Sequence, residues 1–154
     1  MERALLIIVQ FDQRHGQSWP LEDEQSELEE LARSAGCQSV GVIQAPRHTP
    51  VAGTLIGSGK LEEIAQQAQE SQAQVVIFNQ ELSSAQQRNV EERLNVKTID
   101  RTQLILDIFA QRARSQEGKV QVELAQLRYL MPRLSGKGVM LSRLGGGIGT
   151  RGPG

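Results

Sequence analysis

The stretch Ala4-Leu5-Leu6-Ile7-Ile8-Val9, inside an apolar run over residues 3–10, decides the fold class. An unbroken run of Leu, Ile and Val is typical of a strand that is buried on both faces. Such strands belong to parallel sheets whose two faces are covered by helices. The rest of the chain is therefore expected to supply crossover helices and further buried strands.

Helical and strand patterns alternate from this run to about residue 100. A helix is expected over 21–35, with three acidic residues in its first turn and Gly36 closing it. A capping box, Ser83-Ser84-Ala85-Gln86, opens a later helix that should end near Leu94. The remaining expected elements are strands at 39–44, 75–78 and 96–99, an extended piece at 51–56, and a helix over 57–71. This order predicts an α/β domain over residues 1–100, with right-handed βαβ units around a mostly parallel sheet flanked by helices.

A long helical arm is expected over residues 101–135, with Asp100 and Gln103 capping its start. We expect an interruption near Gly118 and an end near Pro132. Apolar residues recur at spacings of three and four, which is a heptad-like stripe. The stripe consists of Val120, Leu124, Leu127, Met131 and Leu134. Because the sequence offers no second helix of this kind, we expect the stripe to lie exposed and to favour self-association or a protein partner.

Charge divides the chain at the same point. Residues 1–100 carry 8 basic and 15 acidic side chains, whereas residues 101–154 carry 9 basic and 3 acidic ones. Eight of the fifteen glycines lie in residues 136–154, a Gly/Arg-rich segment without acids. The segment reads equally as a flexible tail or as a loop that inserts into folded RNA. The candidate RNA-binding residues are Arg112, Arg114, Lys119, Arg128, Arg133, Lys137, Arg143 and Arg151, with Gly146, Gly147 and Gly149.

Residues 53–60 resemble a phosphate-binding loop only superficially. Five residues instead of four separate Gly53 from Gly59, and Leu61 follows Lys60 where a hydroxyl side chain is needed. The simpler interpretation is a tight turn with Ser58 as the helix N-cap. The alternative is an anion or purine-nucleotide site formed by Gly57, Ser58, Gly59 and Lys60 at the N-terminus of the helix.

Composition excludes several other classes of protein. One cysteine and two histidines offer no disulfide framework and no zinc-ligand spacing, so no metal site is expected. No nucleophile–base set is visible, so no catalytic residue is predicted. Five aromatic residues are too few for a base-stacking platform. Without an apolar run of membrane-spanning length or a signal peptide, the expected location is cytoplasmic.

Several motifs resemble the HflX family of ribosome-associated GTPases. In the second half they are Asp100-Arg101-Thr102, ILDIFAQRAR (105–114), QVELAQL (121–127), Pro132-Arg133-Leu134 and GGIGTRGPG (146–154). In the first half they are IGSGKLEE (56–63) and VIFNQELS (76–83). The resemblance covers essentially the whole chain.

The resemblance implies an N-terminal α/β subdomain followed by one half of an antiparallel helix pair and its glycine-rich tip. In that family the N-terminal region binds the large ribosomal subunit and its rRNA, and the protein helps to split stalled ribosomes. The resemblance also implies that GTP and Mg²⁺ belong to a GTPase domain beyond residue 154, which would be a partner of this region. The 154 residues alone are then expected to need no cofactor and to hydrolyse no GTP.

Overall fold

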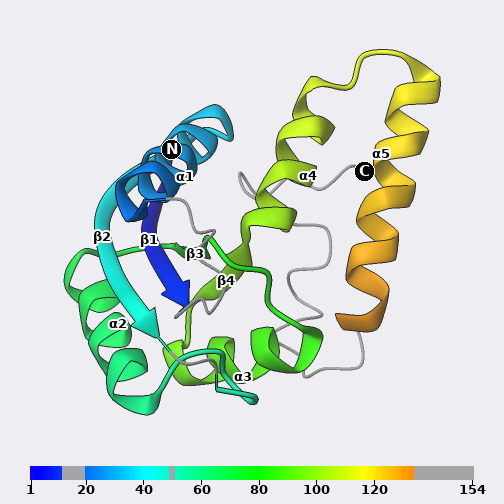
Figure 1. Ribbon diagram of the computed structural model, residues 1–154. Coiled ribbons are helices and arrows are strands. Elements are labelled where there is room, and N and C mark those ends of the chain that lie inside the picture. Colours follow the sequence, from blue (N-terminus) through cyan, green and yellow to red (C-terminus); the bar gives the residue numbers. More distant parts are fainter. Residues whose placement is uncertain (12–19, 49–50, 134–154) are drawn as a thin grey trace.

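The computed structural model describes residues 1–11, 20–48 and 51–133 (Figure 1). Four strands and five α-helices alternate along most of this part of the chain. In order they are β1 (Glu2–Phe11), α1 (Leu21–Ser34), β2 (Cys37–His48), α2 (Ser58–Glu70), β3 (Val75–Phe78), α3 (Ser84–Leu94), β4 (Lys97–Asp100), α4 (Arg101–Arg112), α5 (Gln116–Leu130) and a 3₁₀ turn, η1 (Met131–Arg133).

The four strands form one parallel sheet in the order β2-β1-β3-β4. Leu5 of β1 pairs with Val76 of β3, and Val75 pairs with Lys97 of β4. The predicted parallel sheet is confirmed. Because β1 pairs on both of its edges, it is a central strand, as its unbroken apolar sequence predicts.

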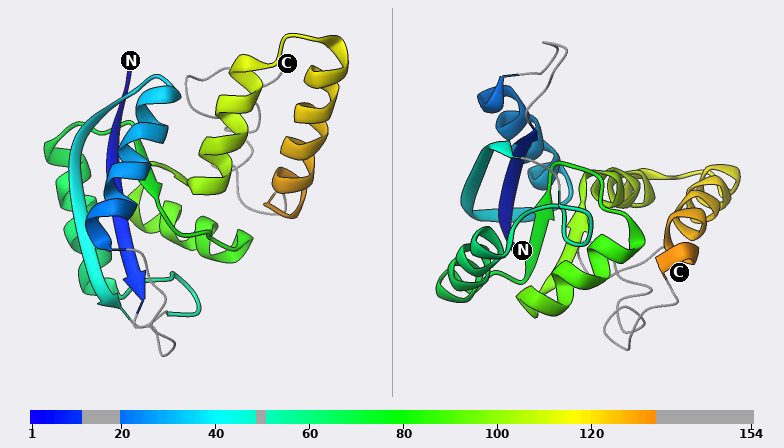
Figure 2. Two further views of the ribbon diagram at one scale, coloured as in Figure 1. Left: turned by 45° about the horizontal axis from the view of Figure 1, so that its top comes forward. Right: turned by 60° about the horizontal axis from the view of Figure 1, so that its bottom comes forward.

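Helices cover both faces of the sheet. Ala4, Leu6 and Ile8 of β1 pack in a core with residues of α1 and α4, whereas Leu5, Ile7 and Val9 pack with residues of α2 and α3. Figure 2 shows these layers from two further directions. All six side chains of residues 4–9 are fully buried, so the stretch that decides the fold class also forms its centre.

Two predicted helix starts are confirmed. The Ser83 side chain accepts from the Gln86 backbone N–H at 3.1 Å, and the Gln86 side chain accepts from the Ser83 N–H at 2.9 Å. The Asp100 carboxylate accepts from the backbone N–H of Gln103 at 3.0 Å and caps α4. Each cap satisfies backbone donors that the first helical turn leaves free.

The extended piece expected at 51–56 is not a strand of the sheet. Val51 and Leu55 form an isolated bridge, with Leu55 at a positive φ of 72°. This small loop turns the chain so that Leu55 and Ile56 are buried. Gly57, and not Ser58, is the N-cap of α2, because Ser58 already belongs to the helix.

The break in the helical arm falls a few residues before the expected position near Gly118, and it reverses the direction of the chain. The chain turns at residues 113–115, and α4 and α5 then run antiparallel and side by side (Figures 1 and 2). Ser115 caps α5 by accepting from the Gly118 N–H at 2.9 Å. The interruption therefore precedes Gly118, which lies in the first turn of the second helix. A partner helix for α5 is thus present within the chain.

Candidate nucleic-acid interface

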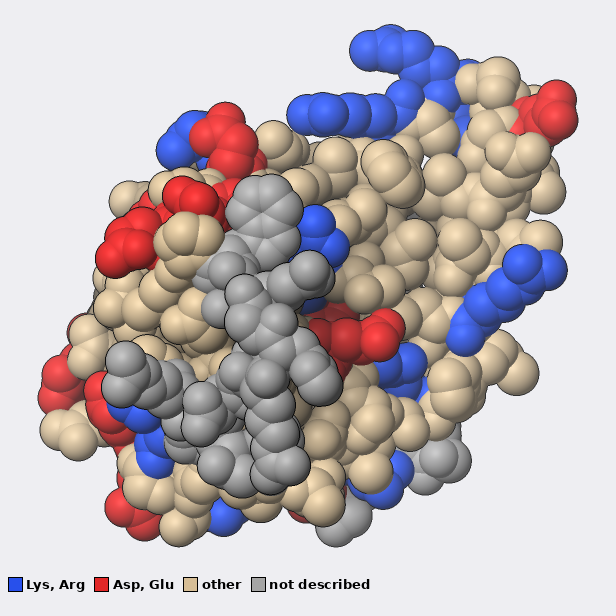
Figure 3. Space-filling view, viewed as in Figure 1, with Lys and Arg blue, Asp and Glu red and all other residues tan. Residues whose placement is uncertain are grey.

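Four of the candidate RNA-binding cations lie exposed on the helix pair formed by α4 and α5. Arg112 ends α4, Arg114 lies in the turn, and Lys119 and Arg128 lie on α5. Within the described part of the chain, none of the four forms an ion pair. Figure 3 shows Lys and Arg side chains gathered where α4 meets α5, far from the sheet, and a further one along the flank of α5. These cations are free to bind an anionic partner.

Arg133 lies in a different environment from these four. Its side chain is only 8% exposed. The guanidinium donates to the Gln87 side chain at 2.8 Å, to the Tyr129 carbonyl at 2.8 Å and to the Leu82 carbonyl. It also stacks on the Tyr129 ring, 3.7 Å from the ring centroid. With its donors used inside the protein, Arg133 is a structural anchor in this arrangement and not an open phosphate contact.

The other predicted residues of the tail lie outside the described residues. They are Leu134 of the stripe and the RNA candidates Lys137, Arg143, Gly146, Gly147, Gly149 and Arg151.

The apolar stripe faces away from the rest of the protein. Val120, Leu124, Leu127 and Met131 are 46–61% exposed, whereas the opposite side of α5 is buried against the body. That buried side carries Gln126 and Tyr129. The two buried side chains of α5 therefore carry polar groups, whereas its apolar stripe faces solvent.

Sequence reasoning missed this polar side of α5. The Tyr129 hydroxyl donates to the buried Asp100 carboxylate at 2.6 Å, and Gln126 donates to buried Asp107 at 3.3 Å. Burial, followed by the neighbouring Asp100, raises the pKa of Tyr129, so the phenol stays protonated and donates. The available signal was the spacing of Gln126, Tyr129 and Arg133, at intervals of three and four, which places them on one face of a helix.

The N-terminus of α2 carries the predicted anion site, but its lysine is engaged with a glutamate of the same helix. A methyl group at Gly57 or Gly59 would meet no other part of the protein within 4 Å. Lys60 forms an ion pair with Glu63 at 3.0 Å, one turn further along the helix. The lysine of the predicted anion site is therefore already paired with a carboxylate.

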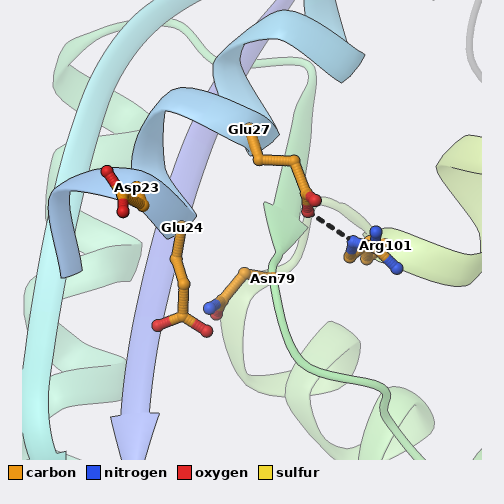
Figure 4. Close-up of a pocket in the computed structure, with 5 residues that line it drawn as sticks. All are labelled: Asp23, Glu24, Glu27, Asn79 and Arg101. Carbon is orange, nitrogen blue, oxygen red and sulfur yellow. Dashed lines mark hydrogen bonds and ion pairs between the residues drawn. The ribbon is translucent and has the colours of Figure 1, made fainter. Parts of the chain in front are cut away.

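A pocket of about 210 Å³ lies at the carboxyl ends of β3 and β4, where ligands of open α/β sheets commonly bind (Figure 4). Asp23, Glu24 and Glu27 of α1 line it together with Asn79 and Arg101. Arg101 is paired with Glu27 at 2.7 Å. Burial raises the pKa of Glu24, with a smaller contribution from Glu27. An acidic lining of this kind repels phosphate and gives no support to nucleotide binding here.

Neither a metal-binding cluster nor a membrane-spanning helix occurs among the described residues. They contain no group of three or more His, Cys, Asp or Glu side chains arranged to hold a metal ion. None of their helices combines the length and apolar character needed to cross a membrane.

Comparison with known proteins identifies the class. The family model described as GTP-binding GTPase N-terminal matches residues 22–110, and the model described as GTP-binding GTPase Middle Region matches residues 112–154. A solved GTP-binding protein from Sulfolobus solfataricus in complex with GDP has a similar fold, with a TM-score of 0.66 and 25% identity over 88% of this chain and 39% of that one. The fold is therefore that of the N-terminal region of a GTP-binding GTPase.

Curated relatives make the assignment more specific. GTPase HflX of Alkalihalophilus pseudofirmus is 56% identical over 135 residues, 86% of this chain and 32% of the relative. GTPase HflX of Escherichia coli is 48% identical over 153 residues, 99% of this chain and 35% of the relative. The chain belongs to the HflX family. It spans about a third of the length of these relatives.

Proposed function

We propose that this chain is the ribosome-binding N-terminal region of an HflX-type GTPase and that it contacts rRNA of the large subunit. The contact surface comprises the exposed cations of the helix pair, which are Arg112, Arg114, Lys119 and Arg128, and the Gly/Arg-rich segment 136–154. In this role the region acts in the cytoplasm and delivers a GTPase that splits or rescues ribosomes.

The observation that carries the proposal is the set of exposed cations without ion pairs on the helix pair. Arginine binds phosphate through a planar fork of donors, and an exposed guanidinium without a carboxylate partner offers all of them. In the α/β part, Arg33 and Lys60 each pair with a glutamate, whereas exposed Arg93 forms no ion pair among the described residues. The four exposed cations lie in the half of the chain with excess positive charge, which leads into the glycine-rich segment.

We further propose that GTP and Mg²⁺ act outside these 154 residues. The two matching family models describe an N-terminal and a middle region, and the relatives are about three times as long as this chain. Gly53 to Lys60 departs from the phosphate-loop pattern at two points. The expected contribution of this region is binding and positioning, with hydrolysis supplied by the partner GTPase domain.

Pelleting of the chain with purified large ribosomal subunits tests the proposal. The test variant replaces four cations with Gln, at Arg112, Arg114, Lys119 and Arg128. Up to four phosphates then have no cation beside them. We expect at least about a tenfold loss of affinity, and a salt dependence whose slope is shallower by about one for each phosphate that is no longer neutralised.

A matched variant controls for net charge. It changes three arginines and one lysine of the α/β part, Arg33, Arg88, Arg93 and Lys60, to Gln. This control should pellet like the unmodified chain. Equally weakened binding in both variants would show that only net charge matters, and unchanged binding of the helix-pair variant would remove its role as an interface.

A further inference from the structure

We propose that Tyr129 and Arg133 form a buried latch that fixes the C-terminal end of α5 against the α/β part. The latch comprises these two side chains and their acceptors, which are Asp100, Gln87 and the Leu82 carbonyl. By fixing this end, it sets the position and direction from which the Gly/Arg-rich segment leaves the protein. The inference rests on the proposed function, because that segment is the proposed RNA contact.

Asp100 is the centre of the latch. It is fully buried at the end of β4. One carboxylate oxygen accepts from the Tyr129 hydroxyl at 2.6 Å and from the Gln103 N–H at 3.0 Å, and the other accepts from the Leu82 N–H at 2.9 Å. A single side chain therefore joins the end of β4, the start of α4, the segment before α3 and α5.

Arg133 ties the same end of α5 to two further sites. Through its three donated hydrogen bonds, the guanidinium connects η1 to α3 at Gln87 and to the segment before α3 at Leu82. Gln87 is itself held, because its amide donates to the Thr98 carbonyl of β4 at 2.8 Å. A buried arginine lacking such acceptors would be strongly destabilising, so this docked position is favoured over small displacements of the helix end.

The two faces of α5 explain why directional bonds are needed. Its apolar stripe lies exposed, and Val122, Ala125 and Leu130 are only partly buried. The buried residues of α5 are Gln126 and Tyr129, and both form hydrogen bonds to buried carboxylates. Apolar contacts also tolerate sliding and rotation, whereas hydrogen bonds with defined partners favour one register. The polar inner face therefore determines how α5 is oriented.

The latch lies next to the proposed RNA-contacting segment in the sequence. Arg133 lies three residues before Gly136, where the proposed RNA-contacting segment begins. Releasing the latch removes none of the four exposed cations, but it frees the end of α5 and the origin of this segment. The expected consequence is weaker binding although every RNA-binding cation is retained.

Two conservative variants of the full chain test the latch. Tyr129→Phe removes one hydroxyl and no charge, and Arg133→Lys retains the charge but removes the fork of donors. Hydrogen exchange reports the α5 amides, with the α2 amides as an internal check of folding. We expect about tenfold faster exchange in α5, unchanged exchange in α2, weaker pelleting with large subunits and an unchanged salt slope. Arg33→Lys, an exposed change on α1, is the matched control.

Each contrary result has a defined meaning. Unchanged α5 exchange in both variants would overturn the latch. Faster exchange with normal pelleting would overturn its positioning role. Normal pelleting of Arg133→Lys, together with a shallower salt slope for Arg133→Gln, would instead make Arg133 a direct phosphate contact. If the unmodified chain fails to pellet, the proposed function fails, while the exchange measurement still decides whether Tyr129 and Arg133 hold α5.

Discussion

Cys37 shows how strongly a single position can be governed by its surroundings. It begins the edge strand β2 and is only 3% exposed within the core that includes α1 and α4. Burial, followed by the charge of Glu2, raises the pKa of Cys37 to about 12. The thiol is therefore a small packing group and not a nucleophile.

The raised pKa predicts that the thiol of Cys37 reacts slowly with alkylating agents in the folded protein. At pH 8 roughly one folded molecule in ten thousand carries the thiolate, against roughly a quarter of unfolded molecules. Alkylation by iodoacetamide should be much slower in native protein than in urea. Because the folded pKa is raised, the stability that the protonated thiol contributes is complete below about pH 8.5 and is lost as the pH rises towards 12. Equal alkylation rates in both states would contradict this account.

Residue roles divide into those that a sequence can predict and those that it cannot. Ser83 and Asp100 act as helix caps as predicted, because capping depends on neighbours three residues away. Arg133 appeared to belong to a basic tail, but its partners Gln87 and Leu82 are 46 and 51 residues distant in the chain. Only the fold reveals contacts of that range.

At the scale of elements, α5 buries Gln126 and Tyr129 and exposes its apolar stripe. The heptad-like spacing correctly grouped Val120, Leu124, Leu127 and Met131 on one face, and their expected exposure is confirmed. The same spacing did not locate the turn at residues 113–115, because the apolar pattern continues through it. Ser115 marks the start of α5, because a serine side chain can cap a helix. Gly118 lowers helix propensity but does not by itself set a helix boundary.

The exposed stripe predicts self-association of this chain. Each of its four side chains has about half of its surface still to bury, worth about 1 kcal/mol apiece. Sedimentation equilibrium should show a concentration-dependent dimer that Leu124→Lys with Leu127→Lys abolishes. Gln69→Lys of α2 with Gln121→Lys of α5 adds the same charge at exposed positions off the stripe and should leave the dimer intact. An unmodified chain that stays monomeric at high concentration would argue against an associating face.

In the whole molecule, the α/β part could be predicted from the sequence, whereas the docking of α5 could not. The apolar run over residues 4–9 and the alternation of helices and strands were enough to predict a parallel sheet covered on both faces, because local patterns determine that arrangement. The order of strands and the docking of α5 depend on contacts between distant segments, and the sequence offered no rule for them. The candidate interface was predictable in part. Charge composition indicated which segment carries it, but only the structure showed that Arg133 is buried while Arg112, Arg114, Lys119 and Arg128 are exposed.

The division of charge along the chain matches the division of the molecule into an α/β part and a helix pair. The acidic residues belong mainly to the α/β part, and the free cations lie on the helix pair that projects from it (Figure 3). An acidic body disfavours contact with RNA phosphate, whereas a basic projection favours it, so one orientation of approach is preferred.

Selective binding to ribosomal subunits tests the central claim most directly. The chain should be pelleted with purified large subunits, and in parallel with small ones, between about 50 and 200 mM salt. The account predicts that the chain pellets with the large subunit and much less with the small one, and that the affinity falls steeply with salt. Equal binding to both subunits, or binding to the large subunit that salt leaves unchanged, would contradict it.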